Sequence, residues 1–159
     1  MQSPAPEAAV RQLLSFQMGG LACAVDLAQV REIVRYELVT RVPRVAACVK
    51  GVINLRGSVV PVIDLAVAFG LPESPVTAET CLLMVEMAVG SERAVVGLLA
   101  ASVNQVLEVG AEDLEPAPPF GTPIPASSLL GLARSPAGIA LVLDVHRLIG
   151  EGVAMEKTA

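Results

Sequence analysis

The segment VKGVINLRGSVVPVIDL, residues 49–65, decides the fold. It contains two short apolar runs, residues 51–55 and 58–63, on either side of Arg56-Gly57. Short apolar runs bounded by turn residues are typical of β-strands. The glycine supplies the backbone freedom that a tight turn requires. The segment therefore predicts two strands joined by a hairpin turn.

A short helix is expected directly after this hairpin. Asp64 can cap residues 65–69, and Gly70 can close the helix. The same order of apolar strand, Asp, short helix and Gly returns about 80 residues later, where residues 145–149 form the second predicted helix. The matching pairs are Gly51 and Gly131, Val62 and Val142, Asp64 and Asp144, and Gly70 and Gly150. An internal repeat of this kind implies two related structural units.

The rest of the chain also consists of short apolar segments separated by Gly, Pro and polar clusters. Hairpins are predicted over residues 12–26 and 81–101. Further strands are predicted at residues 30–34, 39–42, 103–109, 129–133 and 139–143. This spacing is typical of a mainly β protein. We expect two small five-stranded barrels that share a core, because neither half is large enough to be stable alone, with a short helix after each barrel.

The domain organisation follows from the distribution of apolar periodicity along the 159 residues. Residues 12–150 are expected to form a single domain made of two interleaved β-barrel subdomains. Residues 1–11 and 151–159 lack apolar periodicity and are expected to be flexible tails. Residues 115–125 carry five of the twelve prolines, so a stiff, extended connection is expected there.

The composition excludes several classes of function. Hydrophobic residues make up 53% of the chain and aromatic residues only 3%, so the core must be aliphatic. The formal net charge is -5, which disfavours nucleic-acid binding because phosphate contacts need clustered Lys and Arg. No apolar run has the length of a membrane span, and the first residues do not resemble a signal peptide. We therefore expect a cytoplasmic protein.

Few residues could support catalysis or bind a metal. Cys23, Cys48 and Cys81 lie far apart in apolar contexts, so buried, reduced thiols are expected. The only histidine is His146, and no spacing of metal ligands surrounds it. An enzyme that uses Cys81 or Cys23 with His146 stays an open alternative, although no catalytic motif points to it. We predict a binding or scaffold protein with no catalytic residue, no metal and no cofactor.

Residues 49–65 resemble the signature of the CheW family of chemotaxis coupling proteins. The resemblance covers about residues 12–150. It includes Val30-Arg31-Glu32-Ile33, Gly97, the Pro-Ala-Pro-Pro-Phe run at residues 116–120, and Leu143-Asp144-Val145. The central segment is also similar to the regulatory domain of the kinase CheA and to CheV. A chain of this length has no room for a kinase, phosphotransfer or receiver domain, so a single-domain coupling protein is the best match.

The resemblance implies a fold and a function. The expected fold is a pair of SH3-like β-barrels. The expected function is a non-catalytic adaptor that joins the cytoplasmic tip of a methyl-accepting chemoreceptor to the regulatory domain of the histidine autokinase CheA. Such an adaptor would meet the membrane only through the receptor. The alternative is a CheW-like module that binds the receptor only and competes with or modifies the array.

The resemblance also implies binding residues. The receptor tip is a helical hairpin, so an apolar groove between the barrels is expected. The positions that match this receptor-binding groove are Val30, Glu32, Ile33, Asn54, Arg56, Gly57 and Val103. We predict that Arg56 pairs with Glu32 there, whereas a place in the ordinary core is the alternative for the valines. Phe120 matches the family's kinase-contacting aromatic residue, and the alternative is that it packs onto the second barrel.

Overall fold

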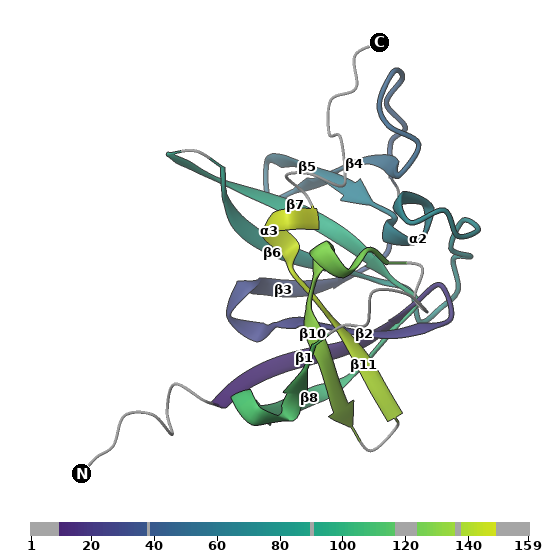
Figure 1. Ribbon diagram of the computed structural model, residues 1–159. Helices are drawn as coiled ribbons and strands as arrows, with labels where there is room; N and C mark the ends of the chain where they lie inside the picture. Colours follow the sequence, from purple (N-terminus) through teal and green to yellow (C-terminus); the bar gives the residue numbers. More distant parts are fainter. Residues whose placement is uncertain (1–9, 38, 90, 117–123, 136–137, 149–159) are drawn as a thin grey trace.

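The structure, a computed structural model, describes residues 10–37, 39–89, 91–116, 124–135 and 138–148. It is mainly β, with two sheets that lie one above the other in Figure 1. The strands are β1 (Val10–Met18), β2 (Leu21–Asp26), β3 (Val30–Arg35), β4 (Val49–Leu55), β5 (Ser58–Ile63), β6 (Cys81–Val89), β7 (Glu92–Ala100), β8 (Ser102–Gly110), β9 (Leu114–Glu115), β10 (Leu129–Ser135) and β11 (Gly138–Leu143). The short helices are η1 (Leu27–Gln29), α2 (Leu65–Ala68), η2 (Ala111–Asp113), η3 (Ala126–Ser128) and α3 (Val145–Arg147).

The strand order confirms the predicted mainly β architecture. Sheet A has the order β8-β1-β2-β11-β10-β9, and sheet B has the order β3-β6-β7-β5-β4. Sheet B has the five strands expected of each barrel, whereas sheet A has a sixth strand, β9. This extra strand is only two residues long, and its Glu115 lies opposite Leu132 of β10.

Each sheet combines strands from both halves of the chain. Sheet A joins β1 and β2 to the late strands β8 to β11, and sheet B joins β3 to β5 to the hairpin β6-β7. In each sheet one parallel pairing joins the two halves, and an antiparallel pairing, β1 with β8 or β3 with β6, joins them as well. Val142 of β11 lies opposite Ala24 of β2, and Val62 of β5 lies opposite Gly97 of β7. The repeat units therefore interleave in space, although they follow one another in the sequence.

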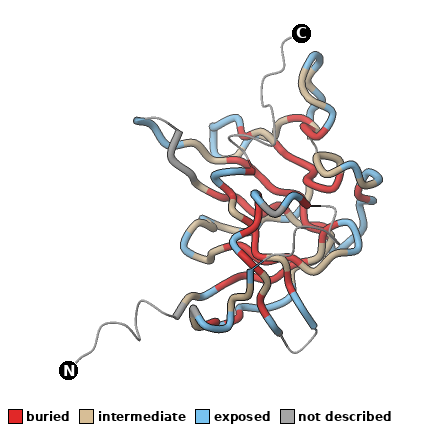
Figure 2. Tube along the Cα trace, viewed as in Figure 1, coloured by how far each residue is buried: buried red, intermediate tan, exposed pale blue. Residues whose placement is uncertain are grey.

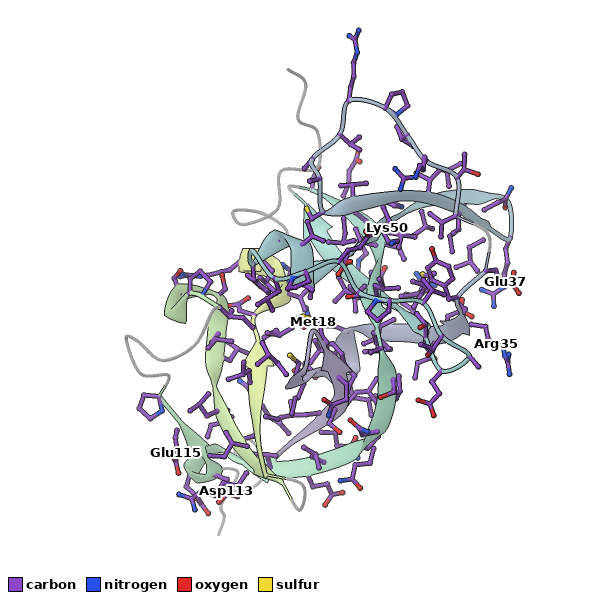
Figure 3. The ribbon with its side chains drawn as sticks, turned by 90° about the vertical axis from the view of Figure 1, so that its right-hand side faces the viewer. Met18, Arg35, Glu37, Lys50, Asp113 and Glu115 are labelled. Carbon is purple, nitrogen blue, oxygen red and sulfur yellow. The ribbon has the colours of Figure 1, made fainter. Side chains whose placement is uncertain are left out.

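The two sheets share one core, as predicted. Phe16 and Met18 of β1 and Leu83 of β6 are completely buried in the same cluster, together with Leu98 and Leu143. Met18 lies at the centre of the molecule in Figure 3, and the buried residues gather where the sheets meet in Figure 2. Each such side chain contributes roughly 1.5–3 kcal/mol through burial. A smaller apolar cluster lies inside each sheet's own barrel, on the side away from this shared core.

Most predicted strands differ from the structure by one or two residues at an end, and one predicted strand is absent. Strand β1 begins at Val10, two residues before the predicted start of the hairpin at residue 12, because Arg11 already pairs with Val109 of β8. The strand predicted at residues 39–42 is wrong. Only Thr40 forms a bridge, with Val52, and Pro43 then removes a donor and is followed by Arg44 with a positive φ.

Both predicted helices lie where the repeat placed them. The Asp64 side chain caps α2 by accepting a hydrogen bond from the Ala66 N–H. The Asp144 side chain caps α3 by accepting one from the Arg147 N–H. The predicted end of the second helix at residue 149 lies outside the described residues. The short helices after each barrel are thus positioned by the same capping residue.

Candidate functional site

Glu32 and Arg56 form a two-pronged ion pair between β3 and the β4–β5 turn. Arg56 Nη1 donates to Glu32 Oε2 at 2.5 Å, and Nη2 donates to Oε1 at 2.7 Å. This fork-to-fork geometry fixes the guanidinium plane as well as the charge. The side chain of Glu32 is 27% exposed and that of Arg56 is 72% exposed. The predicted pairing is confirmed, and its site is solvent-accessible.

The turn that carries Arg56 explains its orientation. Leu55 and Ser58 pair across a two-residue loop in which Arg56 and Gly57 both have positive φ, 54° and 88°. Such turns match the twist of a hairpin but favour Asn and Gly. The Gly57 N–H donates to Asn54 Oδ1 at 2.9 Å, which braces the loop. Asn54 and Gly57 therefore build the turn that presents Arg56.

A small pocket of about 200 Å³ lies beside this pair, and we call it the charged pocket. Its lining residues are Arg31, Glu32, Leu55, Arg56, Ser58, Val60, Met84 and Val95. Glu86 extends the charge along the rim by approaching Arg31 Nη1 at 3.5 Å and Arg93 Nη1 at 3.2 Å. Hydrogen bonds from Arg56 lower the pKa of Glu32, with a smaller attraction from Arg31. The same bonds raise the pKa of Arg56, so both groups are ionised at neutral pH.

The ion pair also links two parts of sheet B that share no ladder. Strand β3 is one edge of the sheet, and β4, which leads into the Arg56 turn, is the opposite edge. Glu32 and Arg56 therefore connect the free edge of β3 to the β4–β5 hairpin. A charged connection of this kind also discourages unwanted strand pairing at an exposed edge.

The predicted apolar groove residues lie on the two edge strands, β3 and β8. Val30 and Val103 are partly buried and pack against the shared core. Val30 lies opposite Val85, and Val103 lies opposite Phe16. Ile33 is 44% exposed, an unusually open place for a large aliphatic side chain.

Val106 is a candidate groove residue that the sequence prediction missed. It lies opposite Leu14, as Ile33 lies opposite Leu83, and it is 46% exposed. The two exposed side chains thus have equivalent places on the two edge strands. The repeat contains the signal, because Val103 and Val106 have the same spacing as Val30 and Ile33.

Val103 contributes to a second pocket, of about 290 Å³, where the end of β3 meets the start of β8. Arg35, Cys81 and Ser102 also line it. Figure 3 shows Arg35, the last residue of β3, and Glu37 at the outer edge of the molecule. Val103 does not line the charged pocket. Of the predicted groove residues, Glu32 and Arg56 line the charged pocket, whereas Val103 lines the pocket at the junction of the two sheets.

The predicted kinase contact, Phe120, lies outside the described residues. The proline-rich segment that contains Phe120 begins at Glu115, which is described and forms an ion pair with Arg134. Glu115 Oε2 accepts hydrogen bonds from Arg134 Nε at 3.0 Å and Nη2 at 2.6 Å. This pair raises the pKa of Arg134 and attaches β9 to β10. It holds the beginning of the proline-rich segment against sheet A.

The cysteines offer little support for an enzyme. Cys23 is completely buried, and desolvation raises the pKa of its thiol to about 12. Cys81 is partly exposed, but its Sγ donates to the Glu79 carbonyl oxygen, 3.4 Å away. His146 is exposed on α3. Among the described residues, no group of three or more His, Cys, Asp or Glu side chains could bind a metal ion.

Comparisons with known proteins identify the family of this chain. The family model for the CheW-like domain matches residues 12–152. The chain is 31% identical to the chemotaxis protein CheW of Klebsiella aerogenes over 145 residues, which covers 91% of this chain and 85% of that protein. It is 31% identical to CheW of Treponema pallidum over 137 residues, covering 86% of this chain and 81% of that protein.

A solved structure shows the same fold. The scaffolding protein TtCheW of Thermoanaerobacter tengcongensis superimposes with a TM-score of 0.79 at 26% sequence identity, covering 97% of this chain and 95% of that one. In the described part of this chain, no helix is both long and apolar enough to cross a membrane. The family match, the relatives and the shared fold extend over nearly the whole chain, and the protein belongs to the CheW-like family.

Proposed function

We propose that the protein is a non-catalytic scaffold that couples the cytoplasmic tips of methyl-accepting chemoreceptors to the regulatory domain of the kinase CheA. The observation that carries the proposal is membership of the CheW-like family over residues 12–152. A relative of the same fold is named a scaffolding protein. The scaffold would work in the cytoplasm and meet the membrane only through the receptor.

The apolar edges of the two sheets suit a helical partner. Val30, Ile33, Val103 and Val106 occupy equivalent places on β3 and β8, and Ile33 and Val106 are almost half exposed. Val and Ile are stiff at χ1, so little rotamer freedom is lost when a helix packs on them. An amphipathic helix could lay its apolar face along these side chains.

The Glu32–Arg56 pair would add orientation to this contact. A guanidinium carries five N–H donors, and two bonds to Glu32 leave others for a partner. Glu32 holds the planar group in one direction, so a receptor residue would meet a fixed donor array. Asn54 and Gly57 would contribute by building the turn. Phe120, within its proline-rich segment, would contact the kinase.

The test is reconstitution with a receptor cytoplasmic fragment and CheA, with kinase autophosphorylation as the readout. The protein should make kinase activity depend on the receptor. Arg56→Ala should reduce receptor binding, whereas Arg134→Ala, which removes an equally exposed and paired arginine of sheet A, should not. Kinase activity that is the same with and without the protein would overturn the proposal. Receptor capture without capture of the CheA regulatory domain would instead identify a receptor-only module.

A further inference from the structure

Two arginines converge on one glutamate beside the charged pocket, and we call Arg31, Glu86 and Arg93 the arginine cluster. Arg31 Nη1 of β3 lies 3.5 Å from Glu86 Oε2 of β6, and Arg93 Nη1 of β7 lies 3.2 Å from the same oxygen. Because both nitrogens approach one oxygen, the two guanidinium groups lie side by side. Three neighbouring strands of sheet B (Figure 1) therefore direct their charges to one point.

The β6–β7 hairpin places the cluster on the same face of sheet B as the charged pocket. Side chains two residues apart share one face of a strand. Met84 and Val95 line the charged pocket, so Glu86 on β6 and Arg93 on β7 continue the face that forms it. Glu86 lies opposite Val95, which makes Glu86 and Arg93 a diagonal pair across the two strands. Arg31 joins the two sites, since it also lines the charged pocket.

The arginine cluster has a surplus of positive charge. Among the described residues, Glu86 is the one carboxylate within ion-pair distance of either Arg31 or Arg93. Arg31 also attracts Glu32 at longer range, but that carboxylate is already held by Arg56. The whole chain carries a formal charge of -5, so the local surplus is opposite in sign to the overall charge.

This surplus is exposed to solvent. The side chains of Arg31 and Arg93 are 55% and 74% exposed, and each makes a single contact with Glu86. Exposed ion pairs of this kind stabilise a fold only weakly, so the cluster is not needed to hold the three strands together. A guanidinium group has five N–H donors, and both arginines can therefore bind a partner while they keep Glu86.

We propose that the arginine cluster binds an acidic side chain of the same receptor helix that the charged pocket holds. The inference rests on the proposed receptor contact, and it adds Arg31 and Arg93 to that contact as residues that determine specificity. A carboxylate suits the cluster because its two oxygens can accept hydrogen bonds from two guanidinium groups. It would also balance the surplus charge.

The spacing along the sheet suits a helical partner. Glu32 lies opposite Met84, and Glu86 is two residues further along β6. Two residues of a strand advance roughly 6.7 Å, close to the roughly 6 Å between helix residues four positions apart. A helix that places one side chain at Glu32 and Arg56 therefore places the side chain one turn away at the cluster. A receptor with a lysine at that turn would meet two arginines and be rejected.

Glu86 makes the inference sharply testable, because it competes with the receptor carboxylate for the same donors. The isosteric variant Glu86→Gln removes this internal acceptor and adds to the positive charge of the cluster. Receptor binding should therefore become tighter, by about threefold. If the two arginines served only to hold Glu86 in place, the same variant would bind no better than wild type.

Arg93→Ala is the second decisive variant, because Arg93 does not line the charged pocket. Its matched control is Arg134→Ala, which removes an arginine of sheet A that is also 74% exposed and paired with one glutamate. The probes are a receptor cytoplasmic fragment and the CheA regulatory domain, titrated separately at low and high salt. Thermal unfolding checks each variant, and Arg93→Gln, which keeps most of the aliphatic stem, takes the place of Arg93→Ala if that variant unfolds.

Arg93→Ala should weaken binding of the receptor fragment about threefold to tenfold at low salt and less at high salt. Arg93→Lys should retain most of the affinity, and Arg134→Ala all of it. Binding of the CheA regulatory domain should stay within about twofold. Full receptor binding by Arg93→Ala would overturn the inference, as would a loss confined to the CheA domain or unchanged or weaker receptor binding by Glu86→Gln. A wild-type protein that does not bind the receptor fragment would instead refute the proposed receptor contact itself.

Discussion

Gly51 and Gly131 occupy the same position in the two sheets. Gly51 lies opposite Val62 at a bulge in the β4–β5 pairing, and Gly131 lies opposite Val142 at a bulge in the β10–β11 pairing. Their φ angles are 152° and 154°. Each glycine lets a passing segment come into backbone contact, at Thr40 and at Glu115 respectively. The interleaved sheets therefore retain the same local geometry about 80 residues apart.

Alanine at either glycine should destabilise the protein, and more strongly at residue 51. An added Cβ would lie 2.1 Å from the Thr40 carbonyl oxygen at Gly51 and 2.7 Å from the Glu115 carbonyl oxygen at Gly131. Neither neighbour is a flexible side-chain end, and positive φ adds strain. We expect losses of roughly 3 kcal/mol for Gly51→Ala and roughly 2 kcal/mol for Gly131→Ala. Urea unfolding measures both, and equal stability of Gly51→Ala and wild type would contradict the close approach.

Asp64 and Asp144 share a capping role but differ in burial, so they form a matched pair for a second prediction. Asp64 is completely buried and accepts from the Ala66 N–H, the Ser74 N–H and the Ser74 hydroxyl. Asn in its place would turn an NH₂ group toward one of these donors. Asp64→Asn should cost about 2–4 kcal/mol. Asp144→Asn, whose side chain is 24% exposed, should cost less than about 1 kcal/mol.

Chemical unfolding of the two Asn variants decides this prediction. Ser74→Ala should reproduce part of the Asp64 effect, because it removes one donor and leaves the carboxylate buried. Equal losses at Asp64 and Asp144 would show that the cap alone matters. In that case the contact with Ser74 would contribute nothing to the position of residues 71–80.

The sequence was sufficient for local structure and insufficient for long-range pairing. The hairpin around Arg56-Gly57 and the cap at Asp64 depend on adjacent residues, and both were predicted. The strand expected at residues 39–42 has only the Thr40–Val52 bridge. Pro43 lacks a backbone N–H donor, so the ladder does not continue past it. Apolar periodicity cannot tell which sheet a hairpin joins, so the registers of the interleaved strands came from the structure.

The same distinction applies to the candidate site. The Glu32–Arg56 pair was predicted through the family resemblance, since the two residues match known motif positions. The pocket of about 350 Å³ that Gln17 and Asn104 line on sheet A was not predicted, because these two residues are 87 positions apart in the sequence. Isolated Gln and Asn residues carry no motif. The two residues come together only when β1 and β8 pair in the folded sheet.

Arg56→Gly should separate turn stability from binding. Arg56 has φ 54°, which glycine adopts at no steric cost, so this variant should fold at least as well as wild type. Arg56→Ala keeps a Cβ in the same strained region and should be slightly less stable than Arg56→Gly. Both should lose the receptor contact. Thermal melts and receptor pull-down together provide the test. Full receptor binding by Arg56→Gly would show that Arg56 does not contribute to the proposed receptor contact.

Titration of Glu32 should report the ion pair directly. Arg56 holds the pKa of Glu32 below its ordinary value. A carboxyl with a lowered pKa in the folded protein adds stability above the ordinary glutamate pKa, and that stability is lost as the pH falls through the lower value. In Arg56→Gly the pKa of Glu32 should rise toward the ordinary range. Carbon-detected NMR of the side-chain carboxyl follows this change, and an unshifted titration would mean that the pair is not populated in solution.

The three cysteines should react with thiol reagents in an order set by burial. Desolvation raises the pKa of Cys23 to about 12 and also raises the pKa of Cys48, whereas Cys81 is partly exposed. The thiolate is the reactive form, so Cys81 should be labelled first and Cys23 only on unfolding. Iodoacetamide labelling followed by peptide mass spectrometry at neutral pH measures the order. Fast labelling of Cys23 in the folded protein would contradict the buried core and reopen a cysteine-based activity. Labelling of Cys81 alone fits a scaffold whose thiols take no part in chemistry.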